Sequence, residues 1–101
     1  MKDPSKDIRY LIRKLISGYT KFFSKNGVLN SDGRKLLEEM IRILVQEYPQ
    51  YKRLVKKVRR NPTLENVLRI AEIFMNENEI KELILLINTG PYRYRIEMIN
   101  K

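Results

Sequence analysis

The 101-residue chain contains no cysteine and no histidine. Their absence excludes disulfide bonds, thiolate nucleophiles, imidazole bases and zinc sites built from thiolate or imidazole ligands. Glycine is scarce, and none of its four copies falls in the spacing of a phosphate-binding loop such as GxxxxGK[ST] or GxGxxG. Covalent, metal or nucleotide chemistry would have to use carboxylates and hydroxyls, so we expect no cofactor and no bound metal.

The carboxylates that lie close together form two groups, one at Glu38 and Glu39 and one at Glu77, Glu79 and Glu82. Adjacent residues point apart on a helix, and the second group lies where a helix is expected to begin, a position at which the helix dipole favours acids. The serines have no base that would activate them. These residues predict capping and solvation, and we expect the protein not to be an enzyme.

Long apolar runs are also missing. None approaches the roughly 20 residues that a transmembrane helix requires. The first seven residues, MKDPSKD, are too polar to begin a signal peptide, and the lack of cysteine fits a reducing compartment. We therefore expect a cytoplasmic protein without a membrane partner.

Positive charge, in contrast, is abundant and unevenly distributed. The chain has 21 Lys and Arg against 12 Asp and Glu, which gives a net charge of +9 and a pI near 9.9. Residues 1–60 carry 16 basic and 6 acidic side chains, whereas residues 61–91 carry 2 and 5. A polyanionic partner is therefore a strong candidate, and it would face the first part of the chain.

Length and hydrophobic periodicity predict one all-α domain. We place this domain at residues 1–91 and a short C-terminal arm at 92–101. Apolar residues recur at helical spacing, and turn signals such as Asn26-Gly27 and Thr89-Gly90-Pro91 separate the segments. The sequence thus predicts a compact bundle of about five helices, at residues 4–25, 31–48, 49–58, 62–75 and 77–88.

The ends and the packing of these helices follow from the same signals. Asp3-Pro4 and Asn61-Pro62 each combine a capping oxygen with a proline suited to a first turn, and predict the starts of the first and fourth helices. Gly27 is placed to end the first helix in a left-handed conformation. Apolar residues cover about half the circumference of the helix at 31–48, so we expect it to be central. The fourth and fifth helices would complete the core, and the first and third would carry basic outer faces.

The sequence PQYKRLVKKVRRNPT, residues 49–63, contains a dense group of positive charges. At about 100° per residue, its apolar side chains share an arc of about 100°, and the basic ones spread over the opposite arc of about 160° with no acid among them. Like charges this close are unfavourable unless an anion binds there. The apolar stripe consists of Tyr51, Leu54, Val55 and Val58. The basic face consists of Lys52, Arg53, Lys56, Lys57, Arg59 and Arg60.

Three interpretations of this face remain open at this point: a solvated surface, a nucleic-acid interface, or a contact with an acidic protein or a membrane surface. We favour the nucleic-acid interface. A second cationic patch is expected on the first helix at Arg9, Arg13 and Lys14, with Tyr10 among them as an aromatic ring able to stack on a base.

The last ten residues, YRYRIEMINK, alternate with a period nearer two than 3.6. Tyr92, Arg93, Tyr94 and Arg95 are candidate nucleic-acid contacts, because they interleave aromatic faces with guanidinium groups. The same pattern also fits an irregular arm packed on the last helix, a strand added to a partner's sheet, or a short helix.

The segment RRNPTLENVLRIAEIF, residues 59–74, resembles the part of Cro/C1-type helix-turn-helix DNA-binding domains that follows the recognition helix. In that family a basic turn ending in Asn-Pro-Thr opens a core helix of the form LExxLxIAxxF. The resemblance implies a recognition helix at residues 49–58, a supporting helix at 37–45, and buried apolar side chains at Ile41, Val45 and Val55. The matching residues of the core helix are Leu64, Glu65, Leu68, Ile70, Ala71 and Phe74.

These observations predict a noncatalytic nucleic-acid-binding protein that contacts backbone phosphates through the basic helix. That helix offers only Gln50 for reading base edges, so we expect little sequence specificity, with DNA favoured over RNA. The alternative is a helical accessory or assembly subunit that docks on a larger protein through surplus apolar surface, for example within a nucleoprotein complex. A homodimer formed through Leu85 and Leu86 is compatible with either function.

Overall fold

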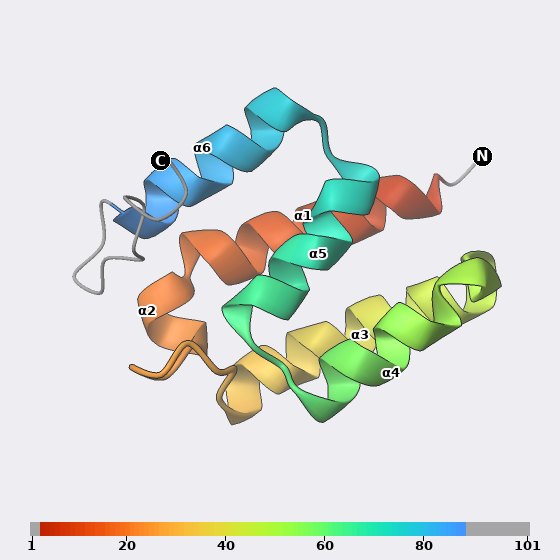
Figure 1. The fold of residues 1–101 in the computed structure, drawn as a ribbon, viewed down its shortest axis with the longest axis horizontal. Helices are drawn as coiled ribbons and strands as arrows, with labels where there is room; N and C mark the ends of the chain where they lie inside the picture. Colours follow the sequence, from red (N-terminus) through yellow and green to blue (C-terminus); the bar gives the residue numbers. More distant parts are fainter. Residues whose placement is uncertain (1–2, 89–101) are drawn as a thin grey trace.

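Helix α1 (Pro4–Ser17) lies at the centre of the fold. In the computed structural model, which describes residues 3–88, α1 packs against α3 (Ser31–Glu47), α5 (Leu64–Phe74) and α6 (Glu77–Asn88) (Figure 1). The predicted central position of the helix at 31–48 is therefore only partly right, because α1 is the helix that packs on α5 and α6 as well as on α3. The buried face of α1 consists of Ile8, Leu11, Ile12, Leu15 and Ile16.

Asp3 starts α1 as predicted. Its carboxylate accepts hydrogen bonds from the Ser5 hydroxyl at 2.7 Å and from the Ser5 amide at 3.0 Å. These two bonds hold the pKa of Asp3 below its ordinary value. The capping interaction satisfies one of the amides that a helix start leaves without an intrahelical partner.

The end of α1 differs from the prediction of one helix over residues 4–25. The helix stops at Ser17, and after Gly18 a single turn, α2 (Tyr19–Phe22), brings the Phe22 ring against that glycine. A Cβ atom at position 18 would lie 2.7 Å from the Phe22 ring, so this contact requires glycine. The apolar stripe thus continues through α2 by a change of direction that hydrophobic periodicity does not reveal.

The connection between α2 and α3 is a tight antiparallel turn. Phe23 and Leu29 form an isolated bridge, and the Ser24 amide donates to the Val28 carbonyl at 2.8 Å. Gly27 has a φ of 75°, which confirms its left-handed conformation. Its predicted place at the end of a helix is wrong, because the helix has already ended at that point.

The same connection is bonded to the loop between α4 (Lys52–Arg60) and α5. The Leu29 amide donates to the Pro62 carbonyl at 2.9 Å, and the Leu64 amide donates to the Gly27 carbonyl at 2.8 Å. These bonds hold the C-terminal end of α4 beside the start of α3.

Helix α3 closely follows its predicted bounds. Asn30 Oδ1 accepts a hydrogen bond from the Gly33 amide at 2.9 Å and starts the helix. A Cβ atom at Gly33 would lie 2.6 Å from the Phe22 carbonyl oxygen, so the first turn of α3 packs directly on the end of α2. The helix ends at Glu47, two residues before Pro49, which disfavours a continued helix.

The predicted basic helix is present as a 3-10 turn, η1 (Pro49–Tyr51), followed by α4. Val55 and Val58 are buried, which confirms the main part of its apolar stripe. Helices α3 and α4 run antiparallel and side by side (Figure 1).

Aromatic rings attach the α3–α4 turn to α5. The Phe74 ring meets the rings of Tyr48 and Tyr51 edge-on, at centroid distances of 5.0 and 6.1 Å. The turn that precedes the basic helix is therefore anchored to the core.

Helix α5 begins later than predicted, and its N-cap is Thr63. The Thr63 hydroxyl accepts a hydrogen bond from the Asn66 amide at 3.2 Å. Asn61 instead ends α4, and its carbonyl accepts a hydrogen bond from Asn66 Nδ2 at 2.7 Å. The prediction of a helix start at Asn61-Pro62 is wrong, because this pair forms the link between two helices.

Helix α6 has the predicted bounds. The Glu79 amide donates to Asn76 Oδ1 at 2.9 Å, and the Asn76 amide donates to Glu79 Oε1 at 3.0 Å, which is a reciprocal capping box. Leu83 and Ile87 are buried against the core.

The described residues 3–88 contain six α-helices and no strand, which confirms the all-α bundle. None of these helices is long and apolar enough to span a membrane. The predicted arm at 92–101 lies outside the described residues.

Candidate nucleic-acid interface

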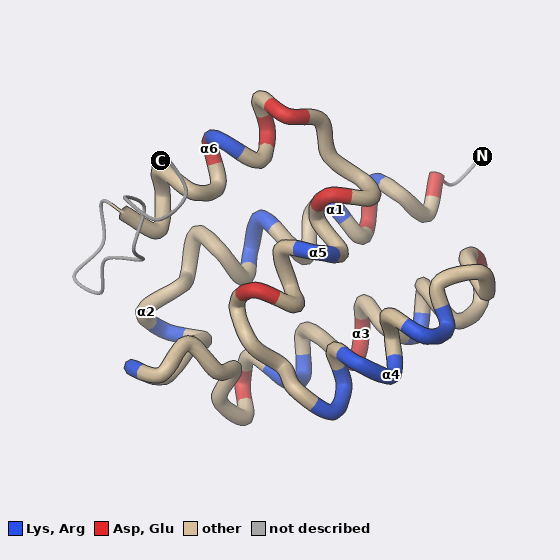
Figure 2. The backbone as a smooth tube through the Cα atoms, viewed as in Figure 1, with Lys and Arg blue, Asp and Glu red and all other residues tan. Residues whose placement is uncertain are grey.

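The outer face of α4 carries a row of exposed cations (Figure 2). Within residues 3–88, five of its six basic side chains form no ion pair. On a helix these five occupy an arc of about 140°, opposite the buried valines. They are Lys52, Arg53, Lys56, Lys57 and Arg60.

Arg59, the sixth basic residue of α4, is bound to Glu38 of α3. Its Nη2 lies 2.7 Å from Glu38 Oε1, and its Nε lies 3.2 Å from Oε2, a two-point contact. The hydrogen bond from Arg59 lowers the pKa of Glu38, and the same bond raises the pKa of Arg59. Arg59, predicted as a phosphate contact, thus has a carboxylate partner within the fold.

The Arg59–Glu38 pair reflects how α3 and α4 are arranged. The two residues lie at nearly equal sequence distances on either side of Pro49, so the helices stay adjacent over their paired length. This is the geometry of an αα-hairpin, whereas the helices of a helix-turn-helix cross at about 90–120°. The assignment of α4 as a recognition helix stays a prediction, to which the hairpin adds no support.

The core residues implied by the helix-turn-helix resemblance are present only in part. Ile41 and Val55 are buried, but Val45 is 56% exposed. The expectation that Val45 belongs to the core is wrong, because its side chain lines an open groove between α3 and α4 and is not covered by either helix.

Beside Val45, a groove of about 300 Å³ runs between α3 and α4. Its apolar side comes from Leu44, Val45 and Val55, and Tyr48 and Pro49 line it at the turn. Three cations of α4 line it as well, and no acidic residue does. These cations are Lys52, Lys56 and Arg59.

The second predicted patch lies on α1. Lys6, Arg9, Tyr10 and Arg13 line an open cleft of about 410 Å³ together with Glu79 of α6. Since α4 packs on α3 and α5, whereas this cleft lies between α1 and α6, the structure does not join the two cationic patches (Figure 2). Lys14 is exposed on α1 but does not line the cleft.

The charge of the α1 cleft is partly compensated. Arg13 Nη2 donates to Glu79 Oε2 at 2.6 Å. The pKa of Glu79 is lowered first by the hydrogen bond with the Asn76 amide and then by that with Arg13. Tyr10 is 62% exposed beside these charges, as predicted for an aromatic on the outer face.

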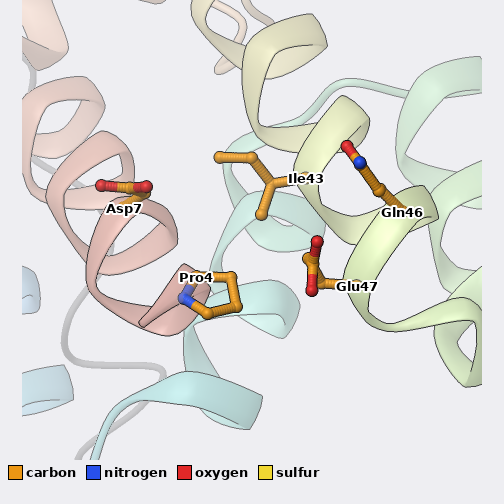
Figure 3. Close-up of a pocket in the computed structure, with 5 residues that line it drawn as sticks. All are labelled: Pro4, Asp7, Ile43, Gln46 and Glu47. Atoms are coloured by element: carbon orange, nitrogen blue, oxygen red, sulfur yellow. The ribbon is translucent and has the colours of Figure 1, made fainter. Parts of the chain in front are cut away.

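A third surface feature is acidic. A small pocket of about 160 Å³ is lined by Asp7 of α1 and by Ile43 and Glu47 of α3, with the isoleucine between the two carboxylates (Figure 3). Glu47 shares this pocket with Pro4 and Asp7 of α1 and does not line the groove beside α4, so the acidic pocket and the cations of α4 are separate surface features.

The remaining predicted contacts are on or beyond α6. Tyr92, Arg93, Tyr94 and Arg95 lie outside the described residues. Leu85 and Leu86 are 58% and 48% exposed, so their predicted role in a homodimer stays a prediction.

Sequence reasoning missed Glu38 and Val45 as residues of this surface. The signal for Glu38 is its register: it faces Arg59 once the chain is folded back at Pro49. Val45 gives no such signal, because its place in the apolar pattern resembles that of its buried neighbours.

No protein-family model, curated protein or solved structure was found to match the chain.

Proposed function

We propose that the protein is a noncatalytic nucleic-acid-binding protein that holds backbone phosphates on the outer face of α4. The observation that carries this proposal is the set of five exposed cations on one nine-residue helix with no ion-pair partner among residues 3–88. A solvated surface helix normally intersperses both signs of charge, and uncompensated repulsion is relieved when polyanion binds.

The dimensions of the face fit a phosphate backbone. From residue 52 to residue 60 the helix rises about 12 Å, over which duplex DNA presents about seven charges at one per 1.7 Å. Five cations therefore have enough phosphates within reach. The amide side chains of Gln50 and Asn61 flank this face and none lies among its cations, so binding has little selectivity for base sequence, with DNA the favoured partner.

Salt-dependent fluorescence anisotropy tests the proposal. With a labelled 20-base-pair duplex, log K should fall against log salt with a slope of about −4.5, which is 0.9 for each of five phosphates. Parallel titrations with single-stranded DNA and with both forms of RNA identify the favoured partner. An affinity that does not change with salt would overturn the proposal.

Two charge-reversal variants distinguish the effect of the α4 cations on DNA affinity from the effect of the total net charge. Arg53→Glu with Lys57→Glu should weaken duplex binding by about tenfold or more and reduce the slope by about 1.8. Arg69→Glu with Lys81→Glu changes the net charge equally, on α5 and α6, and should have a much smaller effect. Equal losses in the two variants would show that the total charge, and not α4, attracts the nucleic acid.

A second function, that of an accessory subunit docked on another protein, is supported by a different observation: the exposed Val45 side chain in the groove beside α4.

A further inference from the structure

We propose that the groove between α3 and α4 is a docking site for an acidic amphipathic helix of a partner protein. Lys52 and Lys56 belong both to this groove and to the outer face of α4, whereas Arg53, Lys57 and Arg60 belong to the outer face alone. Variants at Arg53 and Lys57 therefore test phosphate binding without altering the groove.

The apolar part of the groove calls for an apolar occupant. Leu44 and Val55 are buried at its base, and Val45 leaves more than half of its side chain exposed beside them. A volume of about 300 Å³ lies at the lower end of the range of about 300–1,000 Å³ that is typical of ligand sites. Apolar side chains inserted there would remove the exposed surface of Val45 from water.

The charged part of the groove determines the sign of the occupant. Lys52 and Lys56 lie along it without an ion-pair partner in the described part of the chain. Arg59 lies along it too, held by Glu38. Because no acidic side chain lines the groove, charge complementarity favours carboxylates on the partner.

The length of the groove fits a helix. From Lys52 to Arg59 the α4 side of the groove rises about 10.5 Å, which equals the rise between anchors i and i+7 of a docked helix. A partner helix with leucines along one face and glutamates along its flanks would place apolar groups against Val45 and carboxylates against Lys52 and Lys56. A sugar-phosphate backbone would satisfy the lysines but would leave the apolar wall exposed.

The probe for this site is a fluorescein-labelled peptide of 15 residues with Leu at positions 1, 4, 5, 8, 11, 12 and 15 and Glu elsewhere. Anisotropy titration at 0.15 M salt should show saturable binding to the full chain. Two control peptides, one with each Leu replaced by Ser and one with each Glu replaced by Lys, should bind at least about tenfold more weakly, since each loses one half of the recognition.

Matched protein variants locate the binding. Val45→Asp and the pair Lys52→Glu with Lys56→Glu should each raise the peptide Kd by about tenfold or more. Leu85→Asp introduces the same charge at another exposed aliphatic position, and Arg53→Glu with Lys57→Glu makes the same reversal on the same helix outside the groove. Both controls should leave the peptide Kd within about twofold, and circular dichroism checks that each variant is folded.

Three results would overturn the proposal: equal binding of the Ser-substituted peptide, equal loss in the control variants, or association of the protein with itself that Val45→Asp abolishes in light scattering. The last result would assign the groove to a second copy of the chain. Phosphate binding by the outer face is measured separately, because Arg53→Glu with Lys57→Glu should weaken the binding of duplex DNA and leave the affinity for the peptide unchanged.

Discussion

Helices α1 and α4 both carry basic outer faces, but they contribute to the fold in different ways. Helix α1 buries five large aliphatic side chains, whereas α4 buries only Val55 and Val58. The α1 cleft holds Glu79, which binds Arg13, whereas five cations on the outer face of α4 have no such partner in the described part of the chain. The basic residues of α1 cover the outer side of a helix that contributes strongly to the core. The basic residues of α4 are numerous on a helix that contributes little to the core.

Truncation of core side chains tests the difference in burial between α1 and α4 most directly. Ile12→Ala should reduce the free energy of unfolding by about 3–4 kcal/mol, because it leaves a cavity beneath the central helix. Val58→Ala removes less volume and should reduce it by about 2 kcal/mol. Urea denaturation followed by circular dichroism measures both, and a larger loss for Val58→Ala would contradict the central role of α1.

The elements that could be predicted from the sequence are those fixed by local signals. The bounds predicted near residues 31 and 77 agree with the structure, where Asn30 caps the start of α3 and Asn76 and Glu79 form a capping box at the start of α6, and Pro49 lies two residues after the end of α3. The end of α1 at Gly18 was not predictable in this way. It depends on the contact with the Phe22 ring, which the periodic apolar pattern does not encode.

The two cationic patches are compared by charge reversal. Arg9→Glu with Lys14→Glu on α1 should reduce the affinity for duplex DNA by less than about threefold and the salt slope by less than about one, because this patch lies apart from α4. The same reversal at Arg53 and Lys57 should reduce the affinity for duplex DNA by about tenfold or more. Anisotropy titrations at three salt concentrations give both quantities. Equal effects would show that nucleic acid wraps around α1 and α4 together.

The positions of the charges in the candidate site could be predicted from the sequence, but the contacts between α3 and α4 could not. The six cations of α4 follow from the helical pattern, and all six are exposed. The engagement of Arg59 and the exposure of Val45 depend on how α3 and α4 align, which the bonds between the loops at 27–29 and 62–64 help to fix. Tertiary register of this kind is set by contacts between distant segments.

The ion pair between Arg59 and Glu38 can be removed by mutation. Glu38→Gln removes the carboxylate and releases Arg59 as a sixth cation, so the salt slope should steepen by about 0.9, from about −4.5 to about −5.4. The matched control is Glu39→Gln, which removes the same charge from the adjacent exposed position, where no ion pair exists among the described residues. Equal changes in slope would indicate that net charge, and not release of Arg59, determines the effect.

The smallest expected effect concerns pH. The pKa values of Glu38 and Glu79 are lowered in the folded protein, so each carboxylate contributes stability above the ordinary value of 4.5. That contribution is lost as the pH falls below 4.5 and through the lowered pKa values. For the largely exposed Glu38 pair the loss should stay below about 1 kcal/mol.

Chemical denaturation at pH 6.0, 4.5 and 3.0 measures this loss. Glu38→Gln and Glu79→Gln should each flatten the decline, and Glu79→Gln keeps a side-chain amide oxygen able to cap α6, so its effect reports the charge rather than the cap. Glu79 joins α6 to the central helix, whereas Glu38 joins the two helices of the hairpin. If Glu39→Gln flattens the decline in stability as much as Glu38→Gln or Glu79→Gln does, the two paired carboxylates are not the source of that decline. The difference between the charge on α1, which Glu79 partly compensates, and the charge on α4 would then be supported by nucleic-acid binding alone.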